Sequence, residues 1–228
     1  FDLRRNIKFE NRIEEAHYDD AKRTWTVMTD HGLRATAKHL VLATGNLSTP
    51  QVPKIDGMAN FTGRSFHTGA WPHGGVDFSG QRVGIIGTGS SAVQAIPKIA
   101  EQADLLTVFQ RTANFSVPAR NGSLDPHYER DIKARYAEFR AQNAAQPGGL
   151  YTKINDASAL SVEEDERQTI YEDRWSEGGL PFLSAFNDLG LDRTANDTAA
   201  DFIRSKIREI VDDPEVAELL CPDTTVGC

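Results

Sequence analysis

The chain has 228 residues, of which 39% are hydrophobic and 25% are charged, proportions typical of a soluble globular protein with one large or two small domains. The formal net charge of -8 argues against nucleic acid as a main partner, because duplex binding depends on Lys and Arg against phosphate. No apolar run approaches the length of a membrane span and no signal peptide is recognisable, so no membrane partner is expected.

Two features of the chain bear on its compartment and on its ends. The two cysteines, Cys221 and Cys228, have the spacing of neither a metal-binding knuckle nor a CxxC redox pair. A reducing compartment, and hence a cytoplasmic location, is therefore expected, with no bound metal. The sequence opens on Phe1 and closes on DTTVGC without an obvious terminal element, which suggests a fragment of a longer protein.

Residues 6–45 have a pattern typical of β-strands. Apolar residues alternate in NIKFE, in RIEEAHY and again in TWTVMT. The DHG sequence at residues 30–32 favours a hairpin turn, since Gly32 accepts a positive φ angle. HLVLATG, residues 39–45, is continuously apolar and ends on glycine, as in a strand buried on both faces. We therefore predict a small antiparallel excursion followed by a return strand in a parallel sheet.

A strand, turn, helix and strand are predicted within residues 82–111, after a proline- and glycine-rich connector. The first strand is a short buried one at residues 83–86, and the second is LLTVFQ. The helix between them runs from about Ser90 to about Gln102, with apolar residues on one face and a kink at Pro97.

The turn of this unit, Gly87-Thr88-Gly89-Ser90-Ser91-Ala92, has the pattern GxGxxA in the context that a dinucleotide site requires. Gly87 permits a tight turn, Gly89 lets the backbone approach a pyrophosphate, and Ala92 lets the helix pack closely on the strand. The free N–H groups at the start of the helix then face the anion. Ser90 and Ser91 can cap the helix or donate to phosphate. A turn that merely caps a helix is the alternative.

The residues after the second strand bear on the choice of dinucleotide. An NAD site favours Asp or Glu there, but this chain has Gln110-Arg111-Thr112. An arginine suits a 2′-phosphate, so Arg111 and Thr112 favour NADP(H). A surface arginine without a ligand is the alternative interpretation.

The sequence from Leu124 onward is helical and heavily charged. Candidate helices lie at residues 124–146, at 161–179 with a capping box from Ser161 to Glu164, at 194–213, and at 213–220. The charged residues are expected to form solvated helix faces. Because this block interrupts the alternation of strand and helix, we interpret it as a helical insertion.

One further motif, together with the features above, links the chain to a known family. Residues 61–72 read FTGRSFHTGAWP, or FxGxxxHxxxWP, and they are followed by GxGxxA and by a strand ending in Gln-Arg-Thr. This order and spacing resembles the Baeyer–Villiger monooxygenases, which depend on FAD and NADPH, and in particular those that oxidise phenylacetone or cyclic ketones. VLATGNLSTPQVPKIDG, FQRTANFSVPARN and the charged helices are similar to the same enzymes, so the resemblance covers essentially the whole chain.

The resemblance implies an α/β fold with a Rossmann-like NADP-binding domain, a helical insertion and the C-terminal part of an FAD-binding domain. Residues 1–50 would belong to the FAD-binding domain, 51–80 to the interdomain connector, 81–123 to the NADP-binding core and 124–228 to a truncated insertion. The full protein would insert one oxygen of O2 into ketones to give esters or lactones. No obligate protein partner is expected.

The family's cofactor contacts can be carried over residue by residue. Those to NADP fall on Thr88, Gly89, Ser90, Ser91, Ala92, Val93, Gln94, Arg111 and Thr112. A main-chain contact to the adenine of FAD would fall near Ile13. The family motif and hinge comprise Phe61, Gly63, His67, Trp71 and Pro72. The rings would anchor the connector, with His67 either hydrogen-bonded to the backbone or relaying nicotinamide binding to domain orientation.

The chain departs from the family in two respects. The family opens with its own FAD-binding GxGxxG, whereas this chain has a single glycine-rich turn. The family's active-site arginine usually follows a lysine after the helical insertion, and the chain closes as that segment begins, so no catalytic residue is assigned. Two alternatives remain, namely a heteroatom- or N-oxidising flavin monooxygenase and a non-catalytic NADP-binding module. A disulfide reductase is disfavoured because CxxC is missing.

Overall fold

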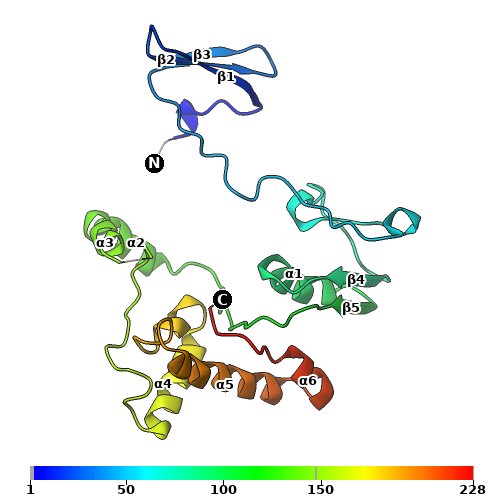
Figure 1. Cartoon of the computed structure of the whole chain (residues 1–228), viewed down its shortest axis with the longest axis vertical. Helices are drawn as coiled ribbons and strands as arrows, with labels where there is room; N and C mark the ends of the chain where they lie inside the picture. Colours follow the sequence, from blue (N-terminus) through cyan, green and yellow to red (C-terminus); the bar gives the residue numbers. More distant parts are fainter. Residues whose placement is uncertain (1–2, 147, 228) are drawn as a thin grey trace. The chain divides into compact units, whose positions relative to one another are not determined.

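The computed structural model describes residues 3–146 and 148–227 and has a mixed α/β architecture (Figure 1). The chain divides into two compact units, Phe1–His73 and Gly74–Cys228, and the division falls inside the predicted connector. Within the described ranges, no helix combines the length and the apolar character that a membrane crossing requires.

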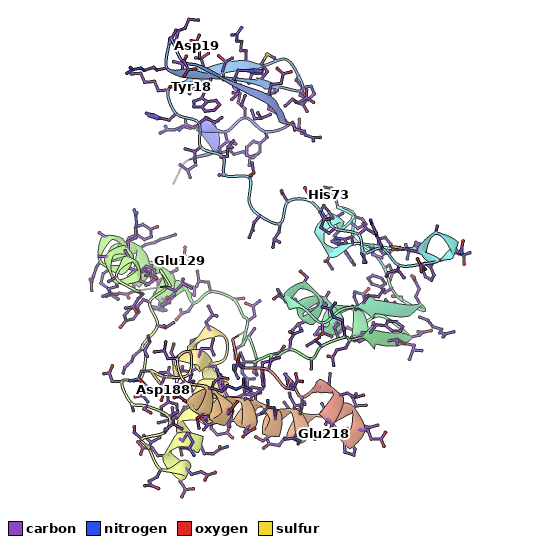
Figure 2. All side chains as sticks on the ribbon, in the orientation of Figure 1. Tyr18, Asp19, His73, Glu129, Asp188 and Glu218 are labelled. Carbon is purple, nitrogen blue, oxygen red and sulfur yellow. The ribbon has the colours of Figure 1, made fainter. Side chains whose placement is uncertain are left out.

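The first unit is built on an antiparallel sheet of three strands in the order β1-β2-β3. The strands are β1 (Ile13–Asp19), β2 (Thr24–Thr29) and β3 (Arg34–Ala37). Tyr18 of β1 pairs with Trp25 of β2, and their ring centroids lie 5.1 Å apart (Figure 2). The predicted hairpin turn is confirmed, because Gly32 has a φ of 74° and its N–H donates to the Thr29 carbonyl oxygen at 2.8 Å.

Two predicted strands of this unit are absent from the structure. HLVLATG, residues 39–45, is irregular, and Val41 and Leu42 are 83% and 74% exposed. NIKFE is also not a strand, and its first residue, Asn6, ends a short 3-10 helix (Arg4–Asn6). The physical reason is that a strand needs a hydrogen-bonded neighbour, and the described part of the sheet ends at β1 and β3. Apolar sequence alone does not supply that neighbour.

The second unit begins with the predicted strand, turn, helix and strand, which are confirmed. β4 (Arg82–Ile86) and β5 (Leu105–Phe109) pair in parallel, and α1 (Ser90–Ala100) connects them and continues through Pro97. The first strand is not buried as predicted, since Ile86 is 70% exposed, and Phe109 of the second strand is 57% exposed. A sheet of two strands has two open edges, and α1 is the helix that packs on it.

The predicted helix at residues 124–146 is two helices, α2 (Pro126–Ala134) and α3 (Tyr136–Ala144). The break lies at Arg135, whose φ of -113° and ψ of 28° are not helical. The Arg135 guanidinium forms ion pairs with Asp131 on one side of the break and with Glu138 on the other. No glycine or proline marks this position, so the local sequence gives no signal for the break.

Three further helices follow, namely α4 (Glu164–Glu177), α5 (Arg193–Ile210) and α6 (Pro214–Leu220), with a 3-10 helix (Leu180–Ser184) between the first two. The predicted end of α4 at Gly178 is confirmed, and its φ is 76°. The predicted capping box is wrong, because the N-cap is Glu163 and makes no side-chain cap bond. The Ser161 hydroxyl instead donates to the Ser158 carbonyl oxygen at 2.9 Å, within the preceding loop.

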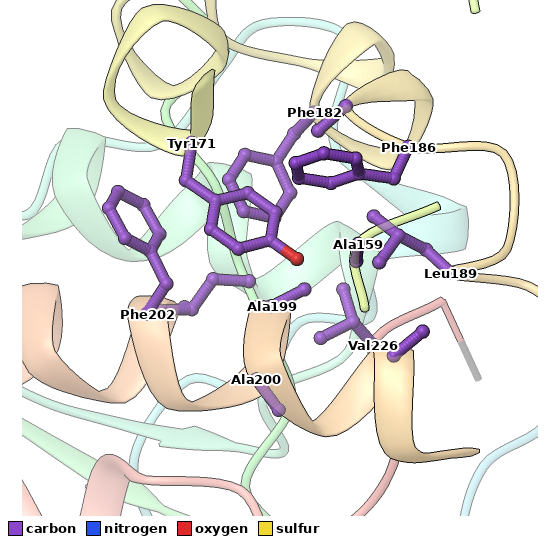
Figure 3. Close-up of a cluster of buried hydrophobic side chains, with 12 residues drawn as sticks. Ala159, Tyr171, Phe182, Phe186, Leu189, Ala199, Ala200, Phe202 and Val226 are labelled. Atoms are coloured by element: carbon purple, nitrogen blue, oxygen red, sulfur yellow. The ribbon is translucent and has the colours of Figure 1, made fainter. Parts of the chain in front are cut away.

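The main hydrophobic core lies among these helices (Figure 3). The Tyr171 ring packs against three phenylalanine rings at centroid distances of 5.3 to 5.7 Å, those of Phe182, Phe186 and Phe202. Phe115, from the segment after β5, packs against the same core. The segment that follows β5 is therefore anchored to the hydrophobic core of the helices.

The segment after α6 is fastened onto α5 by two side chains. Asn196, 4% exposed, donates to the carbonyl oxygens of Leu189 and Val226 at 2.8 and 3.1 Å, and it accepts from the Val226 N–H at 2.9 Å. Arg204 donates to the Pro222 carbonyl oxygen at 2.8 Å. These bonds satisfy backbone groups that no helix or strand can satisfy there.

Candidate dinucleotide-binding site

The glycine-rich turn joins β4 to α1 in a conformation that requires glycine at its first position. Gly87 has a φ of 98°, which residues with a Cβ rarely adopt. Its N–H donates to the Phe109 carbonyl oxygen of β5 at 2.8 Å. The turn is therefore held against the carboxyl end of the neighbouring strand, where open α/β sheets bind ligands.

The second glycine of the turn faces open space. A Cβ built on Gly89 would meet no atom within 4 Å, and its φ of -72° suits any residue. Gly89 is the N-cap of α1, and no side chain caps the helix. The first N–H groups of an α-helix have no partners within the helix, so the end of α1 presents free donors and the positive end of the dipole.

The other residues predicted for the turn lie on the first turns of α1. Ser90, Ser91, Val93 and Gln94 are exposed, and Ala92 is half-buried. Neither serine caps α1, although capping was one of the two roles predicted for them. The Gln94 amide donates to the Ser90 carbonyl oxygen at 2.9 Å. The serine hydroxyls therefore remain available at the open end of the helix.

Asn114 is a site residue that the sequence analysis missed. Its side-chain N–H group lies 3.3 Å from the Thr88 carbonyl oxygen and 3.3 Å from the Thr112 carbonyl oxygen. The Thr88 hydroxyl also donates to the Thr112 carbonyl oxygen, at 3.2 Å. The turn and the segment after β5 are thus joined by side chains. No sequence pattern signals this link, because the residues joined are 26 positions apart.

Arg111 lies between two tethered residues while its own side chain is exposed. Gln110 precedes it and Thr112 follows it, and both are hydrogen-bonded to other segments. Among the described residues, the Arg111 guanidinium forms no hydrogen bond or ion pair. Such an exposed guanidinium can bind a phosphate by donating charge-assisted hydrogen bonds to it.

The FxGxxxHxxxWP residues belong to the first unit and form local contacts. The His67 Nδ1 atom accepts from the Gly69 N–H at 3.0 Å and so caps a 3-10 helix (Thr68–Ala70), while Met58–Asn60 forms another. Phe61 is 66% exposed, and a Cβ on Gly63 would overlap its ring. Trp71 packs on Phe66 with ring centroids 5.8 Å apart.

These contacts are local to the motif, and they do not assign a function to any of its residues. The bond from His67 to the backbone matches the simpler of its two predicted roles, while the relay role remains a prediction. Pro72 is exposed at the end of the motif. Ile13, predicted near the FAD adenine, begins β1 and pairs with Thr29, and its side chain is 51% exposed. Its contact with FAD also remains a prediction.

The residues present fit NADP(H) better than they fit FAD. The glycine-rich turn is open at Gly89, its helix end is uncapped, and an arginine with no partner among the described residues follows β5. For FAD the chain supplies no second glycine-rich turn. Within the described ranges, no group of three or more His, Cys, Asp or Glu residues is placed to hold a metal ion.

The fold and the turn define a class of nucleotide-dependent oxidoreductase. Residues 3–176 match the model of the pyridine nucleotide-disulphide oxidoreductases, and the chain belongs to this family. The chain lacks the CxxC pair of a disulfide reductase, since its cysteines are Cys221 and Cys228.

Individual relatives narrow the class, and they confirm the resemblance to Baeyer–Villiger monooxygenases. The chain is 44% identical to a Baeyer–Villiger monooxygenase of Pseudooceanicola batsensis over 97% of its own length and 41% of the relative. It is 41% identical to the phenazine N-monooxygenase PhzNO1 of Lysobacter antibioticus, over 96% of this chain and 41% of the relative. A structure of oxidized steroid monooxygenase bound to NADP matches all of this chain and 44% of its own, with 51% identity and a TM-score of 0.88. The chain thus spans about two fifths of the length of these proteins.

Proposed function

We propose that this chain is the NADPH-binding part of a flavin-dependent Baeyer–Villiger monooxygenase, whose substrates are a ketone and O2 and whose products are esters or lactones. The similarity to the monooxygenase of Pseudooceanicola batsensis and to the NADP-bound steroid monooxygenase supports this proposal. Residues 81–123 would form the Rossmann-like core and residues 124–228 its helical insertion. Residues 1–50 would belong to the FAD-binding domain and residues 51–80 to the connector.

The observation that carries the proposal is the open space at Gly89. Glycine is needed at Gly87 by the fold, because of its positive φ, but nothing in the described structure requires it at Gly89. Absence of a Cβ there matters only if something else approaches the backbone, as a pyrophosphate does in dinucleotide-binding turns. The uncapped end of α1 supplies the complementary N–H donors.

The chain's own residues would bind and orient the cofactor. The Ser90 and Ser91 N–H groups would hold the pyrophosphate, and the Arg111 guanidinium would hold the 2′-phosphate. When bound, NADPH and FAD supply the hydride transfer and oxygen activation that side chains cannot perform. No side chain of the chain is assigned a direct part in the reaction, and FAD would be held largely by other residues of the full-length protein.

The experiment that tests nucleotide binding is a substitution that the fold tolerates. In the full-length protein, Gly89→Ala is expected to weaken NADP⁺ binding by about tenfold or more, because the methyl group displaces the phosphate from its hydrogen bonds. The melting temperature should not change. Gly74→Ala is the matched control, because a Cβ there also meets no atom within 4 Å. Isothermal titration calorimetry gives the dissociation constants, and equal affinities for wild type and Gly89→Ala would contradict the proposed site.

A second experiment distinguishes ketone oxidation from N-oxidation. The similarity to a phenazine N-monooxygenase makes oxidation of a ring nitrogen the alternative function. The full-length protein should consume NADPH faster when a cyclic ketone is added, and mass spectrometry should find the lactone. Turnover of phenazines to N-oxides, with no lactone from any ketone tested, would instead establish the alternative.

A further inference from the structure

Gln110 connects the candidate phosphate site to a distant helix. Its side-chain N–H group donates to the Leu219 carbonyl oxygen at 2.7 Å, across 109 positions of the sequence. Gln110 directly follows β5 and directly precedes Arg111. The Gln110 side chain therefore tethers the residue directly before the arginine proposed to select the 2′-phosphate.

The acceptor of this bond is a carbonyl that α6 itself leaves free. Leu219 lies in the last turn of α6, where carbonyl oxygens have no partner within the helix. The Cys221 N–H bonds to Ala217 and Glu218 instead. Among the described residues, the Gln110 amide is the donor to the Leu219 carbonyl oxygen.

The segment around Leu219, which accepts the Gln110 bond, is itself bonded to α5. Arg208 of α5 donates to both carboxylate oxygens of Glu218, at 2.6 and 3.0 Å, and this pairing lowers the pKa of Glu218. Arg204 of α5 donates to the carbonyl oxygen of Pro222. Residues on either side of Leu219 are thus bonded to α5, which contributes much of the buried core.

Without the Gln110 bond, few contacts would hold the carboxyl end of β5. β5 has one neighbouring strand, β4, and Phe109 at its carboxyl end is 57% exposed. After Arg111, the chain is fixed by the bonds of Thr112 to Thr88 and Asn114. The two residues Arg111 and Thr112 are therefore held from the α6 side by Gln110 and from the turn side by Asn114.

We infer that Gln110 is a positioning residue for dinucleotide selection: by bonding to Leu219 it fixes the backbone of Arg111, and so the guanidinium, for the 2′-phosphate. This inference rests on the proposed function. If Gln110 had a purely structural role, its substitution would lower the stability of the protein or weaken the binding of NADP⁺ and NAD⁺ alike. If Gln110 positions Arg111, its substitution lowers the affinity for NADP⁺ alone, because NAD⁺ has no 2′-phosphate.

The test uses Gln110→Met in the full-length protein, since methionine keeps the length and apolar stem but removes the donor. NADP⁺ affinity is expected to fall by about two- to tenfold, the range for loss of one net hydrogen bond, while NAD⁺ affinity changes by less than about twofold. Gln142→Met is the matched control, because Gln142 bonds to Glu138 within α3. A folded Gln110→Met protein with unchanged NADP⁺ preference overturns the inference.

A second measurement needs no substitution, and it decides the inference even where Gln110→Met does not fold. Coupling between two sites is reciprocal, so binding of NADP⁺ should slow amide hydrogen exchange at the carboxyl end of α6 more than NAD⁺ does. Equal protection by the two dinucleotides overturns the inference. The proposed function is tested separately, by whether the wild-type protein prefers NADP⁺ at all.

Discussion

The carboxamide of Asn114 lies 3.3 Å from the carbonyl oxygen of Thr88, and this contact joins the glycine-rich turn to the chain that leaves β5. The same N–H group also lies 3.3 Å from the Thr112 carbonyl oxygen. One side chain therefore holds the turn with the proposed pyrophosphate donors to the segment that follows β5.

Asn114→Ala should loosen the turn without unfolding the protein. Because Asn114 holds the turn itself, the affinities for NADP⁺ and NAD⁺ should both fall, by about two- to tenfold, as expected for one net hydrogen bond. This result differs from that expected for Gln110→Met, which affects NADP⁺ selectively. Fluorescence titration of both dinucleotides measures the two affinities. Asn121→Ala is the control, since Asn121 is exposed; a loss confined to NADP⁺ would contradict the proposed role of Asn114.

Arg111→Ala should separate the two dinucleotides most clearly. Loss of charge-assisted hydrogen bonds costs about 1.5–3 kcal/mol, so NADP⁺ binding should weaken by roughly tenfold or more while NAD⁺ binding is spared. Arg111→Lys should recover part of the affinity, because the charge remains but the planar fork is lost. Calorimetric titrations of both variants give the comparison. Equal losses for NADP⁺ and NAD⁺ would show that Arg111 does not read the 2′-phosphate.

Gly178→Ala should destabilise the second unit. Gly178 has a φ of 76°, and an added Cβ would overlap the carbonyl oxygen of Pro118, which accepts from the Gly179 N–H at 2.8 Å. Backbone strain together with overpacking should cost about 3 kcal/mol or more. The control is Gly190→Ala, where a Cβ meets no atom within 4 Å. Urea unfolding compares them, and similar midpoints for both variants would refute the close approach of the Pro118 segment.

Tyr171 should make stability depend on pH in the alkaline range. Burial raises the pKa of its hydroxyl to about 12, from an ordinary value near 10. A folded-state pKa above the unfolded value favours the folded state below pH 10, and this contribution is lost as the pH rises through 12. The Tyr171 hydroxyl also lies 2.7 Å from that of Thr198, so Tyr171→Phe should cost about 1 kcal/mol at neutral pH.

The measurement for Tyr171 is the difference in unfolding free energy between wild type and Tyr171→Phe at several pH values. This difference should be constant up to about pH 9 and should shrink between pH 10 and 12. Tyr136→Phe, on the exposed helix α3, is the control. A difference that stays the same up to pH 12 would show that Tyr171 ionises equally in both states.

The sequence by itself determined the features that depend on local pattern. The spacing of Gly87 and Gly89 between an apolar strand and an amphipathic helix requires a strand, turn and helix in that order, and the structure has them. Gly32 and Gly178 likewise marked a hairpin turn and a helix end. Both have positive φ angles, which glycine adopts more readily than other residues. The motifs and longer segments of the sequence also resembled the Baeyer–Villiger monooxygenases, and the comparisons confirmed this resemblance.

The tertiary structure decided what depends on neighbours distant in the sequence. HLVLATG has the composition of a buried strand, yet without a hydrogen-bonded neighbour it is irregular and exposed. Asn114 and Gln110 acquire their places through partners 26 and 109 positions away, and the break at Arg135 coincides with ion pairs to side chains on both of its sides. Local pattern fixes backbone conformation through sterics, whereas strand pairing and side-chain tethers depend on which segments the folded chain brings together.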